Sequence, residues 1–159
     1  ILVIQSTDTL GKRLVYNIHI KEHLAENREE PLPETITKHH VVYRLGKNSC
    51  SVTDAIGNRK SYTIQKSISF RGKKYPVTEI EKNAFRGHSK LRSITIPALV
   101  CKVGKNAFYN CKSLKKVTVK SKVLTSVGAK AFKKCNKELR FVFPKSKKGF
   151  YRRLFRGKY

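Results

Sequence analysis

Residues 100–119 read VCKVGKNAFYNCKSLKKVTV, and the chain contains two further copies of this pattern. The same frame begins 23 residues earlier at Val77 and 24 residues later at Leu124, and every copy contains the pair Ala-Phe. The matching positions are apolar or small, whereas Lys, Ser, Thr and Asn occupy the positions between them. Such a period indicates a solenoid, because one coil cannot bury its own apolar side but stacked coils form a continuous core.

Each copy predicts the same local structure. The portion Leu-x-x-Ile-x-Ile, residues 91–96 in the first copy, alternates apolar and polar residues and predicts a short strand, which would pair with the next coil about 4.8 Å away. Val77 and Ile80 predict a second short extended edge. The Asn-Ala-Phe segment predicts a tight turn whose ring points inward. We therefore expect three rings to stack as a ladder: Phe85, Phe108 and Phe132.

The four cysteines follow the same repeat logic. Cys111 and Cys135 occupy one repeat position, so we expect them on adjacent coils. A Cα separation of about 4.8 Å lies within the disulfide range, whereas a role as small inward residues favours free buried thiols. We expect the free form and leave a bond open as the alternative. Cys50 reads as a core residue and Cys101 as an exposed one, and the lack of a CxxC pair excludes a zinc ribbon.

The repeated frame, V-x-x-I-G-x-x-A-F-x-x-C-x-x-L-x-x-I-x-I-P, resembles the BspA-type leucine-rich repeat family of bacterial surface proteins, most closely over residues 67–144. The first copy departs from it at Glu81, where the frame has glycine, and at His88, where it has cysteine. The resemblance implies a leucine-rich-repeat-like right-handed solenoid, mostly β with short helical turns. It also implies a secreted or cell-surface location and an adhesion or protein-interaction function, with host or bacterial surface proteins or glycans as partners.

Charge divides the chain into two parts. Residues 1–38 contain five Lys or Arg and six Asp or Glu, whereas residues 39–159 contain 31 and four, a net charge of +27. Two prolines mark the break, at Pro31 and Pro33. We expect residues 1–38 to be an N-terminal appendage or linker, with a strand-like alternation over 14–20 and a polar helical turn or two over 21–30. The sequence begins without methionine and is read as a processed or trimmed product.

Residues 39–159 predict a capped repeat domain, with a cap over 39–75, repeats over 76–144 and a C-terminal cap over 145–159. Solenoid ends need caps because an open end exposes the core. A hairpin is predicted over 40–53. At the other end a short amphipathic helix is predicted, with these residues on its apolar face: Phe150, Tyr151, Leu154 and Phe155.

An enzyme is a remote alternative. Residues 19–23 read H-x-x-E-H, an inverted zinc-peptidase signature formed by His19, Glu22 and His23. A peptidase also needs a third ligand, a cleft and a large surrounding domain, and this segment is short and ends at the prolines. The chain has no G-x-S-x-G motif and no glycine-rich phosphate loop, and its basic part offers no acid–base pair among four carboxylates. We expect no enzymatic activity, no metal and no other cofactor.

The formal net charge of +26 is the remaining functional clue. We predict basic rows along the solenoid axis, one at the strands and two at the turns. The strand row is Arg92/Lys115/Arg140, at equivalent positions of the three copies, and Lys116 and Lys120 nearby complete the strand-adjacent site. The turn rows are Lys82/Lys105/Lys130 and Arg86/Lys133/Lys134.

Such rows suit an extended anionic polymer, which makes a cell-wall polymer, a sulfated glycan or nucleic acid the alternative partner. Nucleic acid is the least expected of these, because no helix-turn-helix, zinc-finger or RNA-binding aromatic motif is present. A lysine-rich surface that only keeps the protein in solution is the simpler interpretation. No apolar run approaches the roughly 20 residues of a membrane helix, so membrane insertion is not expected.

Overall fold

The computed structural model describes residues 2–7, 13–18 and 34–159, with side chains over 34–159. The chain divides into two compact units, Ile1–Pro31 and Leu32–Tyr159. In the first unit β1 (Leu2–Thr7) pairs antiparallel with β2 (Arg13–Ile18), which covers most of the predicted strand. The helical turns predicted over 21–30 and the candidate zinc ligands His19, Glu22 and His23 lie outside the described residues.

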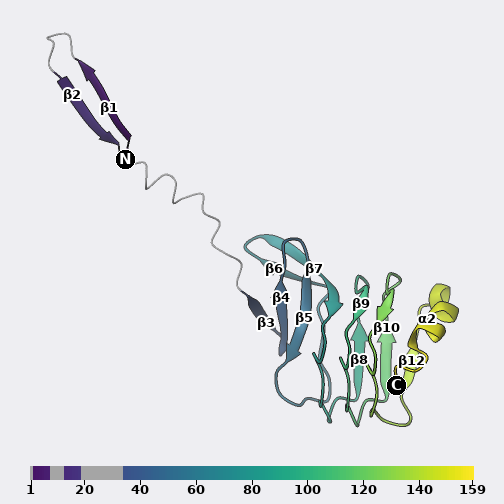
Figure 1. Cartoon of the computed structure of the whole chain (residues 1–159). Coiled ribbons are helices and arrows are strands. Elements are labelled where there is room, and N and C mark those ends of the chain that lie inside the picture. The colour runs from purple at the N-terminus through teal and green to yellow at the C-terminus, as the bar shows by residue number, and fades with distance from the viewer. Residues whose placement is uncertain (1, 8–12, 19–33) are drawn as a thin grey trace. The chain divides into compact units, whose positions relative to one another are not determined.

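The second unit begins with an antiparallel cap (Figure 1). The predicted hairpin is formed by β4 (Val41–Leu45) and β5 (Cys50–Ala55). The predicted boundary at 38/39 falls between two paired strands, because β3 (Thr35–Lys38) pairs antiparallel with β4. Ile36 explains this pairing, since its half-buried side chain packs against the core. Then β6 (Ser67–Phe70) pairs with the first half of β7 (Lys73–Ile80), whose second half runs parallel to β5.

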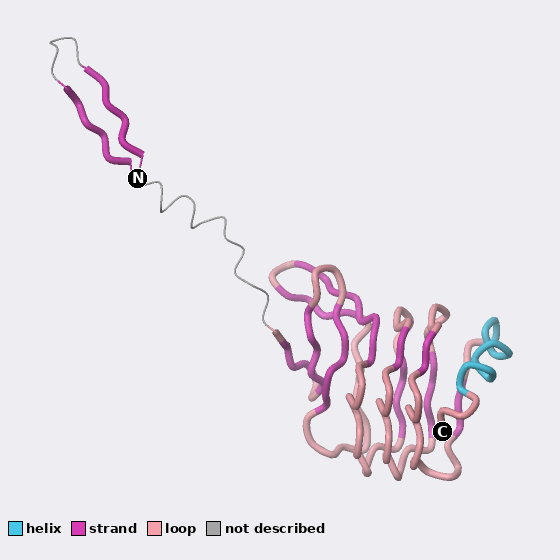
Figure 2. Tube along the Cα trace, in the orientation of Figure 1, coloured by secondary structure: helices cyan, strands magenta, loops and turns pink. Residues whose placement is uncertain are grey.

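Stacked coils form the rest of the unit (Figures 1 and 2). One parallel sheet contains β8 (Ser93–Ile96), β10 (Lys116–Val119) and β12 (Arg140–Val142). Two short strands, β9 (Lys102–Val103) and β11 (Ser126–Val127), extend the sheet of β7 in parallel. Both predicted strand positions are therefore present, and the second unit is the β-solenoid expected from the repeats.

The predicted ring ladder forms the centre of the core. Phe85 and Phe108 stack with ring centroids 5.0 Å apart and an angle of 5° between the rings, and Phe108 and Phe132 repeat the same geometry. The ladder continues into both caps. Tyr62 lies 5.5 Å from Phe85, and Phe155 lies 5.7 Å from Phe132. Each coil thus buries its phenylalanine against the coils on either side.

Close stacking explains the glycine of the repeat frame. A Cβ on Gly104 would lie 2.4 Å from the backbone nitrogen of Lys82, and one on Gly128 would lie 2.3 Å from that of Lys105. The first copy meets the cap instead, and there the frame position is filled by Glu81. Its carboxylate accepts hydrogen bonds from Ser51 Oγ at 2.5 Å and from Arg44 Nη1 at 2.9 and 3.0 Å. Glu81 therefore ties the first coil to the cap.

The C-terminal cap consists of a 3-10 turn, η1 (Lys145–Lys147), and the helix α2 (Lys148–Phe155). Tyr151 and Phe155 are fully buried, whereas Phe150, predicted on the packed face, is 45% exposed. The Tyr151 hydroxyl accepts a hydrogen bond from Leu124 N at 3.2 Å and donates one to Ser121 O at 3.0 Å. These two bonds fasten the helix to the last coil.

Candidate functional site

The strand face, defined as the outward side of β8, β10 and β12 with the residues beside these strands, contains the predicted site. Register places Ser93, Lys116 and Arg140 side by side on successive strands. A shallow depression of about 460 Å³ is lined by Lys115, Lys116, Glu138, Arg140 and Val142. Three of the five predicted site residues thus lie together. Arg92 and Lys120 are exposed but do not line the depression.

The predicted row Arg92/Lys115/Arg140 is wrong in its last member. Ser93 pairs with Lys116, so Arg92 and Lys115, which directly precede them, are equivalent as expected. Arg140, however, lies opposite Lys116. The third copy has one residue fewer between its leucine, Leu139, and the strand, so Arg140 moves into the Lys116 position.

An ion pair lowers the positive charge of the strand face. Lys115 Nζ lies 2.8 Å from Glu138 Oε2, and both side chains are exposed. The hydrogen bond from Lys115 holds the pKa of Glu138 below its ordinary value. Glu138 does not belong to the site predicted from the sequence. One sequence feature could have identified Glu138. The third copy has an extra residue before Leu139, and Glu138 lies in that longer segment.

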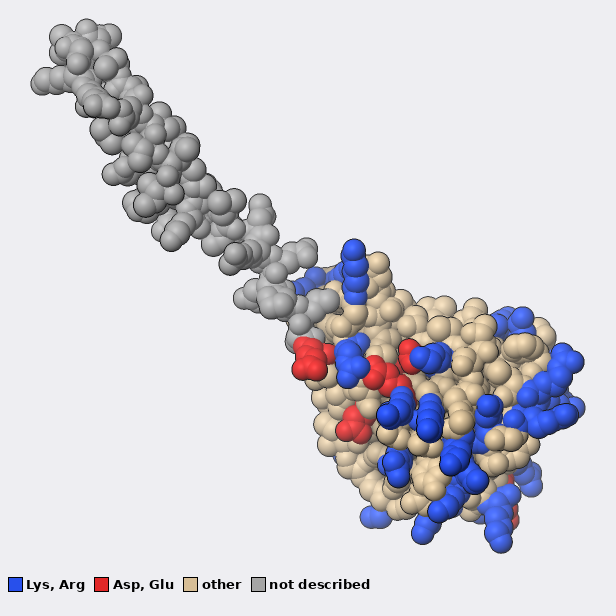
Figure 3. All heavy atoms as spheres, in the orientation of Figure 1, with Lys and Arg blue, Asp and Glu red and all other residues tan. Residues whose placement is uncertain are grey.

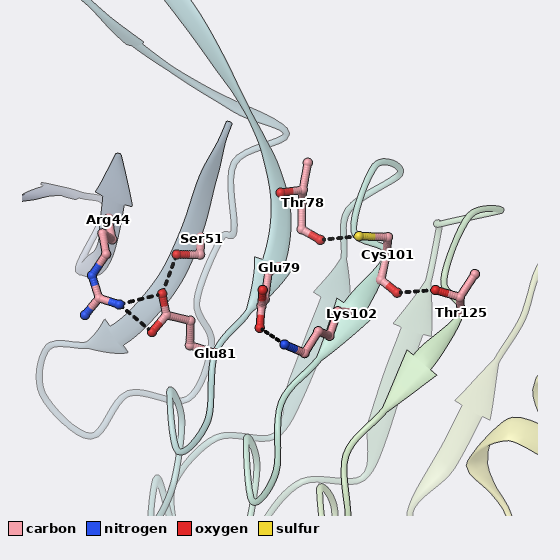
Figure 4. A network of polar contacts seen from close by, with 8 residues as sticks. All are labelled: Arg44, Ser51, Thr78, Glu79, Glu81, Cys101, Lys102 and Thr125. Atoms are coloured by element: carbon pink, nitrogen blue, oxygen red, sulfur yellow. Dashed lines mark hydrogen bonds and ion pairs between the residues drawn. The ribbon is translucent and has the colours of Figure 1, made fainter. Parts of the chain in front are cut away.

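The other face of the coils, formed by β5, β7, β9 and β11, contains two more glutamates, and each forms an ion pair with a base of the same face (Figure 4). Glu81 points toward Arg44 and Ser51, and Glu79 Oε1 lies 2.9 Å from Lys102 Nζ. The hydrogen bond with Glu79 raises the pKa of Lys102. Each of these carboxylates is held by a base, and the arrangement presents no pair of carboxyl groups suited to acid–base chemistry.

All four cysteines are free thiols, as expected for Cys111 and Cys135, although Cys135 is only half-buried. Cys111 and Cys135 occupy the same position on adjacent coils and donate to the carbonyls of Phe85 at 3.0 Å and Phe108 at 3.1 Å. Cys50 is buried, and this burial raises its pKa to about 11. Cys50 is therefore a protonated core group and a poor nucleophile at neutral pH. Cys101 is exposed, and its thiol donates to Thr78 O (Figure 4).

His88, at the cysteine position of the first copy, connects that coil to the cap. Its Nδ1 lies 2.8 Å from the Tyr62 hydroxyl, and its ring meets Phe85 edge-on. Burial lowers the pKa of His88, which keeps the ring neutral at neutral pH.

Within residues 2–7, 13–18 and 34–159, no three His, Cys, Asp or Glu side chains are placed to hold a metal ion. In the same residues no helix is long and apolar enough to cross a membrane.

The turn edge, defined as residues 82–90, 105–113 and 129–137, contains both predicted turn rows. Here the predicted row Lys82/Lys105/Lys130 is wrong in its last member. Lys130 takes the slot of Asn83 and Asn106, and all three residues have positive φ, at 55°, 64° and 56°. Asn83 N donates to Lys105 O and Asn106 N to Ala129 O, so Ala129 occupies the lysine position of the third coil.

The family of the chain follows from comparison with known proteins. Residues 54–158 match the BspA type leucine rich repeat region in six copies, and the chain belongs to this family. The match extends beyond the three repeats that the sequence shows most clearly, into both caps. No curated protein sequence matches the chain.

Solved structures show the same fold. A leucine rich cell surface protein from Faecalibacterium prausnitzii is 32% identical with a TM-score of 0.62, over 70% of this chain and 31% of that one. A leucine-rich repeat protein from Bacteroides ovatus is 22% identical (TM-score 0.53, 70% of this chain, 38% of that one). Another, from Bacteroides capillosus, is 17% identical (TM-score 0.53, 70% and 99%). The chain therefore spans about a third of the length of the first two.

Proposed function

We propose that the domain is a non-enzymatic binding module of a secreted or surface-displayed protein, and that it attaches to a protein or glycan on a host or bacterial surface. The family and the likeness to a cell-surface protein from F. prausnitzii support this proposal. The observation that carries it is the strand face, a regular parallel surface with a charged depression. Repeat arrays use such open surfaces for binding.

The strand face offers a mixture of contacts that suits an acidic patch on a folded partner. Lys116 and Arg140 project side by side, Thr118 lies next to them, and Val142 is 46% exposed at the end of the depression. Charged, polar and apolar groups within a few ångströms of one another are typical of the margin of a protein interface. The exposed Lys115–Glu138 pair adds a donor and an acceptor whose pairing favours one register of the partner.

Binding of the full chain to immobilised host matrix proteins and to intact bacterial cells tests this proposal. We expect the variant Lys116→Glu/Arg140→Glu to weaken binding about tenfold or more, since each substitution places like charges against an acidic partner. The control variant Lys47→Glu/Lys66→Glu makes the same change in charge on the cap and should bind like wild type. Equal losses in the two variants, or no binding by wild type to any of these surfaces, would overturn the proposal.

A second candidate function is the binding of an anionic polymer, which the net charge of +27 on residues 39–159 favours. Ionic strength separates the two functions. Affinity for a polyanion falls steeply with salt because binding releases condensed counterions, whereas a mixed protein interface depends on salt more weakly.

A further inference from the structure

The turn edge is strongly cationic. Its three nine-residue segments contain nine exposed bases and no Asp or Glu: Lys82, Arg86, Lys90, Lys105, Lys112, Lys130, Lys133, Lys134 and Lys137. The carboxylates Glu79, Glu81 and Glu138 bind bases that lie outside this edge. In Figure 3 most acidic side chains gather toward the N-terminal cap, whereas Lys and Arg cover the coils beyond it.

An aromatic ring organises the centre of the turn edge. Arg86, from the preceding coil, places Cζ 5.4 Å from the centre of the Tyr109 ring, and Lys134, from the following coil, places Nζ 5.7 Å from it. Both distances lie within the range of cation–π attraction. The ring therefore stabilises two cations from different coils, and an extended anionic ligand that crosses the coils would meet both.

Two lysines of the turn edge have a backbone conformation that lysine rarely adopts. Lys130 and Lys134 have φ of 55° and 60°, in the left-handed region, where the second coil has Asn106 and Asn110. Asparagine tolerates this region better than lysine does. Sparsely populated backbone conformations cluster at functional sites, where the strain serves a purpose. Here the two lysines add charge to an edge that already lacks acids.

We propose that the turn edge binds a sulfated glycan, whose anionic groups lie against Arg86, Lys133 and Lys134 around Tyr109. This inference rests on the second candidate function and moves its site from the strand face to the turn edge. Coils about 4.8 Å apart repeat the cations at short intervals, which suits the dense sulfates of such a chain. Single-stranded nucleic acid fits less well, because it needs aromatic faces for its bases and Tyr109 is already contacted by a cation from each neighbouring coil.

Heparin is the probe, and the full chain is titrated over a range of salt. The turn-edge variant is Arg86→Gln/Lys133→Gln/Lys134→Gln. Its matched control on the strand face, Lys116→Gln/Lys120→Gln/Arg140→Gln, removes the same number of charges. We expect the turn-edge variant to lose about tenfold or more in affinity and its log–log salt slope to fall by about 2, or about 0.7 per lost contact. The control should change affinity less than threefold, about what screened long-range charge gives.

A second pair of variants tests the ring without changing charge. Tyr109→Ala should weaken heparin binding several-fold because Arg86 and Lys134 lose their common support, whereas Tyr109→Phe should bind like wild type. Thermal unfolding of each variant shows whether it is folded. A loss in Tyr109→Ala alone supports the site, and unchanged binding by a folded Tyr109→Ala contradicts the role of the ring.

The possible failures are distinguishable. A wild-type chain that does not bind heparin at physiological salt would overturn both the anionic-polymer function and this site. Equal losses in the two triple variants would leave the polymer function standing and overturn the turn edge as its location. Tighter binding of oligothymidylate than of heparin at equal total charge would overturn the choice of partner and assign the edge to nucleic acid.

Discussion

Replacement of Gly128 by alanine tests the close stacking of the coils. The new Cβ would lie 2.3 Å from Lys105 N and 2.6 Å from Gly104 C, and both neighbours are backbone atoms. Real Cβ contacts are not shorter than 3.0 Å, so the adjacent coil has to move by at least 0.7 Å. That movement strains the hydrogen bond from Gly128 N to Val103 O, now 2.7 Å. Loss of this bond, about 1 kcal/mol, and overpacking of about 1–3 kcal/mol predict destabilisation of about 2–4 kcal/mol.

Urea unfolding followed by circular dichroism measures this free energy, and Gly149→Ala is its control. Gly149 lies in α2 with no atom within 4 Å of an added Cβ, so alanine there should be neutral or should stabilise by up to about 1 kcal/mol. If Gly128→Ala unfolds within about 0.5 kcal/mol of wild type while Gly149→Ala behaves as expected, the coils do not stack in this register. Gly104→Ala, with a Cβ 2.4 Å from Lys82 N, should repeat the Gly128 result.

Three further predictions concern the core and use the same unfolding measurements. Phe108→Ala should cost about 3–5 kcal/mol, because its ring stacks between two others and the coils cannot collapse into the void. Tyr151→Phe should cost about 1–3 kcal/mol, since Leu124 N and Ser121 O lose their buried partner. Burial raises the pKa of Tyr43 to about 12. The unfolded chain therefore ionises first as pH rises above about 10, stability falls between pH 10 and 12, and Tyr43→Phe should remove that part of the fall.

The core could be predicted from the sequence because each coil repeats the same local problem. A position that is apolar in every copy has to face the stack, so the Ala-Phe pairs alone are enough to identify both the turn and the ring ladder. The same reasoning predicts the two strand positions and the burial of Tyr151 and Phe155. Phe150 differs because Tyr151 and Phe155, four positions apart on the eight-residue helix, face the last coil, and Phe150 lies to the side of them with 45% of its surface exposed.

The site was harder to predict because surface register depends on single residues that the apolar frame does not constrain. Arg140 and Lys115 both follow a leucine, yet the shorter distance from Leu139 to the strand places Arg140 opposite Lys116. Lys130 resembles a member of the lysine row in sequence but fills a backbone slot that the other coils give to asparagine. β3 falls within the predicted appendage because the prolines mark a change in composition, whereas a strand joins a sheet through its backbone.

The placement of the few carboxylates relates the fold to the proposed binding. Residues 39–159 contain only Asp54, Glu79, Glu81 and Glu138, and the three glutamates bind Lys102, Arg44 and Lys115 away from the turn edge. A compact state with a high concentration of one charge is destabilised by its own repulsion. The nine bases of the turn edge therefore raise the free energy of the folded chain when no anion is present. An anionic polymer that binds there relieves this repulsion and adds its own contacts. Part of the binding free energy therefore comes from the repulsion that is present in the unbound protein.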